Sequence, residues 1–204
     1  RPDLVLGFSD MQADIAADLV RAGIAVHIFN QRSVEEIMDF IALLGRMVGA
    51  PAKTDALLDE LQRGMDVVMT SASKIKLKPR VYFEEWDEPM ISAIKWVSEL
   101  IAMAGGKDCF VERAAFQGAK ERIISDPAEV IAQAPELIIG SWCGKKFRPE
   151  KVAARPGWDT LPAVRNGQLR EIKSCDILQP GPAALGDGLR QLHQHIRQCA
   201  EQQS

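Results

Sequence analysis

The chain contains 204 residues, of which 47% are hydrophobic and 26% charged, and its formal net charge is −3. This composition is typical of a globular protein and excludes an intrinsically disordered chain. The charge gives no electrostatic footprint for nucleic acid, and no apolar run reaches the ~18 residues that cross a membrane. The length allows one ordinary domain or two small lobes.

Strands and helices alternate in the first fifty residues. Apolar runs and a stretch of helical periodicity predict a strand, a helix and a second strand at residues 4–8, 10–22 and 24–29. Ser33, followed three residues later by Glu36, predicts a capping box at the start of a helix that runs to about residue 48. This β-α-β-α order favours a parallel sheet.

A long uninterrupted helix is predicted at residues 51–77, and it is the most informative feature of the sequence. Its apolar residues recur every three or four positions, on one stripe of a helix about 40 Å long. Pro51 suits its first turn, Lys74 and Lys76 match the dipole at its end, and Pro79 stops it. Because crossover helices within one sheet are much shorter, we expect this helix to join two lobes.

The alternation resumes after this helix. Apolar runs predict strands at residues 81–85, 136–141 and 169–173, and periodicity predicts helices at residues 92–104, 126–134, 149–154 and 182–198. Asp126 or Ser125 is expected to cap the second of these helices. The predicted fold class is therefore α/β, with two lobes of mainly parallel sheets joined by one long backbone helix. We expect a partial N-terminal lobe at residues 1–50, the inter-lobe helix at 51–78 and a C-terminal lobe at 79–204.

Ligands of open parallel sheets bind beyond the carboxyl ends of the strands. This rule selects five loops, at residues 8–10, 30–32, 86–89, 142–146 and 174–176. Two of the four tryptophans, Trp86 and Trp142, lie in them. Each one either offers a ligand its flat apolar face or fills the edge of its lobe's core, and the two together favour the ligand.

Residues 142–146 form the most unusual local sequence. Gly144 gives the backbone freedom, and Lys145 and Lys146 offer donors to an anionic group unless they only form a solvated turn. The glycine and lysine pattern that begins at Gly140 resembles a phosphate loop, but it is one spacer short and lacks the Ser or Thr that holds magnesium. We therefore exclude nucleotide hydrolysis.

The sequence offers fewer signs of catalysis or of metal binding. Cys143 needs a nearby histidine to act as a nucleophile, but one histidine lies in a strand and two on the expected exposed side of the last helix, namely His27, His193 and His195. An acidic cluster suits an acid–base site, a metal site or a solvated strand end, and it consists of Glu84, Glu85, Asp87 and Glu88. Without clustered histidines, we expect no transition-metal site and no resident cofactor.

Four segments resemble one known family. They correspond to its first-lobe strand, inter-lobe helix, second-lobe turn and helix–strand unit, and they lie at residues 2–6 (PDLVL), 51–77, 101–108 (IAMAGGKD) and 125–139. In order and spacing, the sequence resembles the ABC-transporter substrate-binding proteins that carry cobalamin, haem or ferric siderophores. Residues 84–89 and 141–146 look most like those of cobalamin-binding members.

The resemblance implies a non-catalytic, monomeric protein, periplasmic or tethered to the outer face of a membrane, that delivers a chelate to an ABC permease. Family members have a further β-α portion before the strand that matches residues 2–6, so the first lobe is expected to be partial. Cys175 and Gln179 stand where the cobalamin carrier has an Asp and an Arg, with Asp176 adjacent, which weakens the assignment of cobalamin itself. Docking on the permease is expected through Glu129.

The expected ligand site gathers ten residues, namely Phe8, Arg32, Glu85, Trp86, Asp87, Trp142, Cys143, Lys145, Lys146 and Asp176. The aromatic residues supply apolar area, the basic residues meet anionic edges, and the carboxylates accept hydrogen bonds. The expected ligand is cobalamin or a related corrinoid, haem or ferric siderophore. Two alternatives stay open: an enzyme that uses Cys143 or the acidic cluster, and a metal-ion carrier of similar fold.

Overall fold

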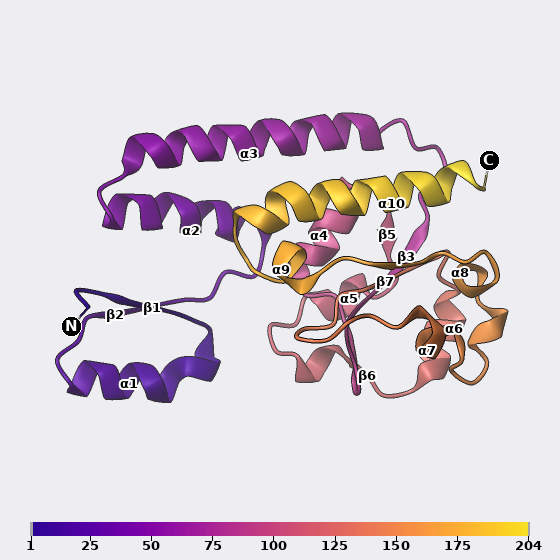
Figure 1. Ribbon diagram of the computed structural model, residues 1–204, viewed down its shortest axis with the longest axis horizontal. Helices are drawn as coiled ribbons and strands as arrows, with labels where there is room; N and C mark the ends of the chain where they lie inside the picture. Colours follow the sequence, from indigo (N-terminus) through magenta and orange to yellow (C-terminus); the bar gives the residue numbers. More distant parts are fainter. Residues whose placement is uncertain (1, 204) are drawn as a thin grey trace.

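The computed structural model describes residues 2–203, and its first elements form a small two-stranded unit at one side of the molecule (Figure 1). β1 (Val5–Phe8) pairs in parallel with β2 (Val26–Phe29) through η1 (Asp10–Gln12), a 3₁₀ turn, and α1 (Ala13–Arg21). The predicted strands and helix are confirmed. α1 buries none of its residues, and its Ile15 and Val20 are each 61% exposed. This unit therefore adds little to the main core.

Two antiparallel helices follow, and the first has the predicted cap (Figure 1). They are α2 (Val34–Met47) and α3 (Pro51–Ala72). The hydroxyl of Ser33 accepts the N–H of Glu36 at 3.2 Å, and the Glu36 carboxylate accepts the N–H of Ser33 at 3.0 Å. The capping box is thus confirmed.

The long helix ends earlier than predicted. α3 stops at Ala72 rather than at residue 77, because the chain tightens there into i→i+3 hydrogen bonds from Lys74 to Ser71 and from Ile75 to Ala72. Ile75 then packs against the core. The lysines that were assigned to the last helical turn lie beyond the helix, and Pro79 does not stop it.

The rest of the chain is built around a six-stranded sheet whose central path is β6-β4-β3-β7-β8. Its strands are β3 (Arg80–Asp87), β4 (Met90–Ser92), β5 (Lys107–Asp108), β6 (Ile123–Ile124), β7 (Leu137–Gly140) and β8 (Leu169–Glu171). β3 pairs in parallel with β5 and β7, and β7 with β8, whereas β4 pairs antiparallel with both β3 and β6. The predicted α/β class with a mainly parallel sheet is confirmed.

The hairpin between β3 and β4 differs from the prediction. Trp86 and Asp87 belong to β3, not to a loop, because the strand continues and turns back only at Glu88 and Pro89 to pair with β4. The helix that was expected from Ser92 starts at Lys95 as α4 (Lys95–Met103). A three-residue strand is too short to show a period of two in the sequence.

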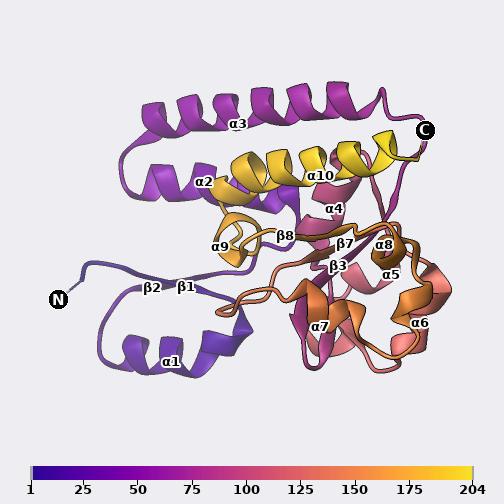
Figure 2. The ribbon, with the colours of Figure 1, turned by 45° about the vertical axis from the view of Figure 1, so that its right-hand side comes forward.

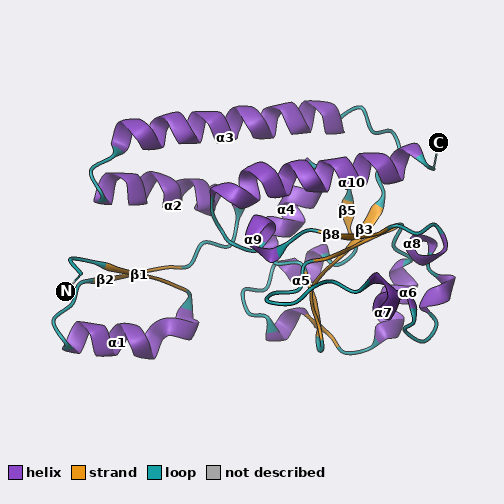
Figure 3. Ribbon diagram, in the orientation of Figure 1, coloured by secondary structure: helices purple, strands orange, loops and turns teal. Residues whose placement is uncertain are grey.

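Short helices complete the chain (Figure 3). They are α5 (Val111–Ala114), η2 (Lys120–Arg122), α6 (Pro127–Gln133), α7 (Pro149–Ala153), η3 (Trp158–Thr160), α8 (Pro162–Arg165) and α9 (Ser174–Ile177), followed by the π-helical η4 (Ala184–Gly188) and α10 (Leu189–Glu201). Asp126 caps α6 as predicted, since its carboxylate accepts the N–H of Ala128 at 2.9 Å. Residues 174–176, expected to be a loop, form most of α9.

The two faces of the sheet are covered by different helices. Val81 and Phe83 of β3 face a core shared with α2, α3, α4 and α10, which lie together on one side (Figure 2). Tyr82 faces the opposite core, which Phe147 and Trp158 complete. α2 and α3 share this first core with the sheet, α4 and α10. The domain boundaries predicted at residues 50 and 78 therefore stay a prediction. No helix among residues 2–203 is both long and apolar enough to cross a membrane.

Candidate ligand-binding site

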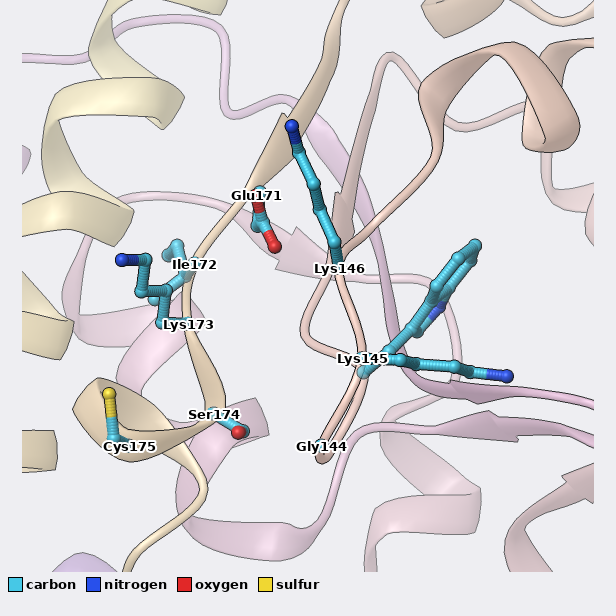
Figure 4. A pocket seen from close by; sticks show the side chains of 9 residues that line it. Gly144, Lys145, Lys146, Glu171, Ile172, Lys173, Ser174 and Cys175 are labelled. Carbon is cyan, nitrogen blue, oxygen red and sulfur yellow. The ribbon is translucent and has the colours of Figure 1, made fainter.

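A cavity of about 600 Å³ opens at the edge of the sheet where the parallel strands β7 and β8 end (Figure 4). Its lining comes from the segment after β7 and from the end of β8 with α9, and consists of Trp142, Gly144, Lys145, Lys146, Glu171, Ile172, Lys173, Ser174 and Cys175. Two of the five loops selected from the sequence therefore meet at one cavity. The position of this cavity agrees with the rule that ligands bind beyond the carboxyl ends of parallel strands.

The wall formed by residues 142–147 is anchored at both ends. Trp142 and Phe147 are buried, and their ring centroids lie 5.0 Å apart. Phe147 packs directly on Gly140, where an added Cβ would lie 1.9 Å from the ring. The backbone N–H of Phe147 donates to the carboxylate of Glu171 in β8 at 3.1 Å. The four residues between these anchors are exposed. The loop thus presents its tip to the cavity from a fixed base.

A buried polar network fixes Trp142 to the central strand. The fully buried carboxylate of Glu84 accepts the indole N–H of Trp142 at 3.0 Å and the hydroxyl of Tyr82 at 2.9 Å. Arg155 donates to the same carboxylate, at 2.9 Å from Nη2. Burial, reinforced by Glu84, raises the pKa of Tyr82 well above its usual value. Burial lowers the pKa of Arg155, but the bond to Glu84 outweighs burial and raises it overall.

The four carboxylates of the acidic cluster predicted from the sequence lie in four different environments. Glu84 lies in the buried network, Glu85 pairs with Arg122 of η2, Asp87 pairs with Lys145, and Glu88 is exposed. The structure therefore does not gather these carboxylates into one acid–base or metal site. Among residues 2–203, no three side chains of His, Cys, Asp or Glu come together as metal ligands.

Four of the predicted residues converge beside the cavity. The ammonium nitrogen of Lys145 lies 4.2 Å from the ring centroid of Trp86 and 5.3 Å from that of Trp142, and it pairs with Asp87. A register shift between Glu84 and Trp86 re-aims the end of β3 toward this loop. Lys145 points away from Glu171 and Lys173 across the cavity (Figure 4). Its charge thus faces Asp87 instead of the cavity.

Of the two roles that the sequence left open for Trp142, the structure shows core packing, and contact with a ligand stays a prediction. Trp142 is only 4% exposed and packs in the core, as expected of a residue that fills the edge of a lobe. It also contributes to the cavity lining. Trp86 is half-buried, and its indole N–H donates to the carbonyl of Glu88 at 2.8 Å.

The cavity carries an excess of positive charge. Lys146 and Lys173 line it, and neither forms an ion pair within the described part of the chain. Glu171 is the acidic residue of the lining, and it accepts the N–H of Phe147. Sequence reasoning missed Lys173 and Glu171, although both lie at the end of a predicted strand, directly before a selected loop.

The thiols and Asp176 lie near the same cavity. Cys175 lines it, and the exposed Cys143 belongs to the loop that forms the opposite wall. The Asp176 carboxylate accepts bonds from Gln191 of α10 at 3.1 Å and from Cys175 at 3.3 Å. These two bonds lower the pKa of Asp176, and the second raises that of Cys175. Asp176 is therefore engaged with α10.

The remaining predicted residues lie outside the cavity lining. The guanidinium of Arg32 lies 5.1 Å from the ring centroid of Phe8, so these two first-lobe residues contact each other. Gln31 beside them donates to the carbonyl of Pro180 at 3.2 Å, which connects the end of β2 to the segment after α9. Glu129 of α6 pairs with Arg113.

The sequence predicted that the two histidines of the last helix lie on its exposed side. The structure instead places both in partly buried positions. The ring of His193 contacts the carbonyl of Ala104 at 2.9 Å and the hydroxyl of Ser71 at 2.8 Å. His195 is half-buried, and burial, together with Arg170, lowers its pKa. Neither histidine contributes to the lining that contains Cys175.

Comparisons with known proteins identify the class to which this chain belongs. The family described as periplasmic binding protein matches residues 1–175, so the chain belongs to this family. No curated protein matches the sequence. The family match confirms the predicted binding protein, and the enzyme alternative that uses Cys143 or the acidic cluster is set aside.

Solved structures share the fold over nearly the whole chain. A possible iron-binding, periplasmic solute-binding protein from Staphylococcus epidermidis is 22% identical, with a TM-score of 0.79 over 96% of this chain and 76% of that one. The vitamin B12 binding protein BtuF of Vibrio cholerae is 19% identical, with a TM-score of 0.71 over 97% and 75%. The haem-binding protein RhuT from Roseiflexus is 20% identical, with a TM-score of 0.77 over 96% and 77%.

Proposed function

We propose that this chain is the substrate-binding component of an ABC importer and that it carries cobalamin or a related large chelate, such as another corrinoid, haem or a ferric siderophore. Proteins of the same fold are named for vitamin B12, for haem and for iron, which supports a metal chelate as the class of ligand. The family supports a periplasmic or extracellular location, tethered to a membrane, and a permease as partner.

The single observation that carries this proposal is the composition of the cavity beyond β7 and β8. It combines an indole wall from Trp142 with the ammonium groups of Lys146 and Lys173, neither of which forms an ion pair among residues 2–203. Flat apolar contact area suits the face of a macrocycle, and lysines suit carboxylate or phosphate groups at its edge. A volume of about 600 Å³ holds part of such a chelate, and the rest would project toward the first lobe.

The opposite wall of the cleft is assigned to the first lobe. Phe8 and Arg32 end β1 and β2, and their contact with each other presents an aromatic ring beside a cation. The hydrogen bond from Gln31 to Pro180 supports this placement, because it holds the end of β2 near the segment that follows α9. The rigid α3 and the anchored loop limit movement on binding, so the site would be largely pre-formed.

Docking on the permease is assigned to Glu129. Its side chain is partly exposed on α6, and its partner Arg113 lies on the neighbouring α5. A surface ion pair of this kind exchanges at little cost, so Glu129 can turn to a basic group of the permease. We propose that the chain acts as a monomer in this complex.

A direct titration tests the proposal. The purified protein is titrated with cyanocobalamin, haemin and a ferric siderophore while tryptophan fluorescence and visible absorbance are followed, with free Zn²⁺ and Mn²⁺ as further arms. We expect saturable binding of one chelate at micromolar or lower concentration, with quenching of tryptophan. Saturable binding of a bare metal ion without any chelate would instead support the metal-carrier alternative, and no binding in any arm would contradict both.

A further inference from the structure

The ammonium group of Lys145 occupies a small cage formed by two aromatic rings and a carboxylate. Its nitrogen lies 4.2 Å from the ring centroid of Trp86, 5.3 Å from that of Trp142, and in an ion pair with Asp87. The Asp87 side chain is only 11% exposed. Two indole faces and a carboxylate around one nitrogen are the groups with which proteins recognise alkylammonium ions. The cage is therefore a cation site, with Lys145 as its occupant.

The walls of the cage are held independently of Lys145. The indole N–H of Trp142 donates to the buried Glu84, and that of Trp86 donates to the carbonyl of Glu88 at 2.8 Å. Asp87 lies in the ladder between β3 and β4, where it pairs with Met90. The cage would therefore keep its shape with another cation in place of Lys145.

Lys145 is attached to the site only through an exposed turn. Gly144 before it has a φ of +74° and open space around it, and the Lys145 side chain is 40% exposed. A tethered group competes with free ligands at an effective concentration of about millimolar. A small free cation is thus excluded, whereas a cation attached to a ligand that is already held next to the cage competes on equal terms.

We propose that the cage of Trp86, Trp142 and Asp87 is a subsite for an amine or quaternary ammonium group of the transported chelate, and that this group displaces Lys145. Among the proposed ligands, the subsite selects a ferric siderophore that carries such a group, because neither cobalamin nor haem has an ammonium group. The inference rests on the proposed function, because the cavity that would hold the chelate shares Trp142 and Lys145 with the cage. The exchange conserves the charge balance at Asp87. It also releases the Lys145 ammonium to join Lys146 and Lys173 around the anionic part of the ligand.

The subsite is tested without any chelate, so that its failure and that of the proposed function are distinguishable. Choline is the probe, and 3,3-dimethylbutan-1-ol is its neutral isostere. Isothermal titration compares the full chain with Lys145→Ala, with the double variant Lys145→Ala/Asp87→Asn, and with Lys151→Ala, an exposed lysine of α7 outside the cage. Circular dichroism verifies that each variant is folded.

Lys145→Ala removes the tethered competitor, so we expect it to bind choline at least about tenfold more tightly than the wild type. The neutral isostere should not bind, the double variant should lose choline, and Lys151→Ala should match the wild type. If Lys145→Ala binds choline no more tightly than the wild type, or binds the neutral alcohol equally well, the subsite is overturned. Choline binding by Lys145→Ala in a protein that binds no chelate would uphold the subsite and contradict the proposed function.

Discussion

The indole N–H of Trp142 donates to the carboxylate of Glu84 at 3.0 Å, and this bond joins the wall of the ligand cavity to the central strand β3. Glu84 is fully buried, and Arg155 neutralises its charge from the segment after α7. Three separate parts of the chain thus meet at one carboxylate. The position of the cavity wall therefore depends on a buried charge that does not itself line the cavity.

Replacing Glu84 by Ala should destabilise the protein by about 3–5 kcal/mol, because Arg155 and Trp142 would lose their buried partner. Glu84→Gln keeps an acceptor for the indole and should cost less. Urea unfolding followed by circular dichroism measures both. The control is Glu150→Ala, whose carboxylate lies on the surface, and its effect should stay within about 0.5 kcal/mol. Equal effects of Glu84→Ala and Glu150→Ala would contradict the role of the network.

Gly140→Ala should displace Phe147 and with it the whole loop. The added Cβ would lie 1.9 Å from Cδ2 of the ring, in a core without free space, so we expect a loss of stability of about 1–3 kcal/mol. Gly181→Ala is the matched control, because nothing lies within 4 Å of its added Cβ. Thermal unfolding compares the two variants. A Gly140→Ala protein as stable as Gly181→Ala would show that the loop is not anchored by this contact.

The four thiols should react with iodoacetamide in a fixed order. Burial, with Asp108, raises the pKa of Cys109 to about 12, and burial, with Glu136, raises that of Cys199 to about 11. Cys143 and Cys175 are exposed, and the bond to Asp176 raises the pKa of Cys175. At about pH 8, Cys143 should therefore be labelled first, and Cys109 and the buried Cys199 last, as read by mass spectrometry of peptides.

Labelling of Cys143 also tests the binding role of its loop. Cys143 is a non-catalytic residue at the exposed tip of the loop, so Cys143→Ala should keep its fold. A change in its affinity for the ligand would then show that Cys143 contacts the ligand. Rapid labelling of Cys109 in the folded protein would show that its side of the sheet opens, contrary to the structure.

His195 should make stability depend on pH below neutrality. Burial lowers its pKa from the usual 6.5, so the unfolded chain takes up a proton before the folded chain does as pH falls. The free energy of unfolding should therefore decrease as pH drops from 6.5 toward the lower folded pKa. His195→Gln should remove this part of the decrease. Urea unfolding at about pH 7.5 and about pH 5.5 measures it, and equal losses in both proteins would refute the assignment.

Local signals in the sequence predicted the features that depend on neighbouring residues. Ser33 and Glu36 form their cap, Asp126 caps α6, and the segment after β7 reaches the edge of the sheet. The class of protein followed from the order of four segments, which is confirmed by the family match over residues 1–175.

Features that depend on partners distant in the chain could not be predicted. Glu84 seemed part of an exposed acidic cluster because its partner Arg155 lies 71 positions away. Lys173 and Glu171 became site residues only through the parallel pairing of β7 with β8. The sequence placed the end of α3 too late, because Lys74 and Lys76 are compatible with the last turn of a helix. The packing of Ile75 against the core decides where the chain turns.

The central claim is that the cavity beyond β7 and β8, together with the adjoining end of β3, binds a metal chelate. It is tested most directly by the affinity of Trp86→Ala and Lys146→Ala for the chelate that the titration identifies, with Lys151→Ala as control. Removing an aromatic anchor should weaken binding by more than about 1 kcal/mol, while the control keeps its affinity. If Trp86→Ala and Lys146→Ala both bind as tightly as the wild type, the ligand lies elsewhere and the site is wrong.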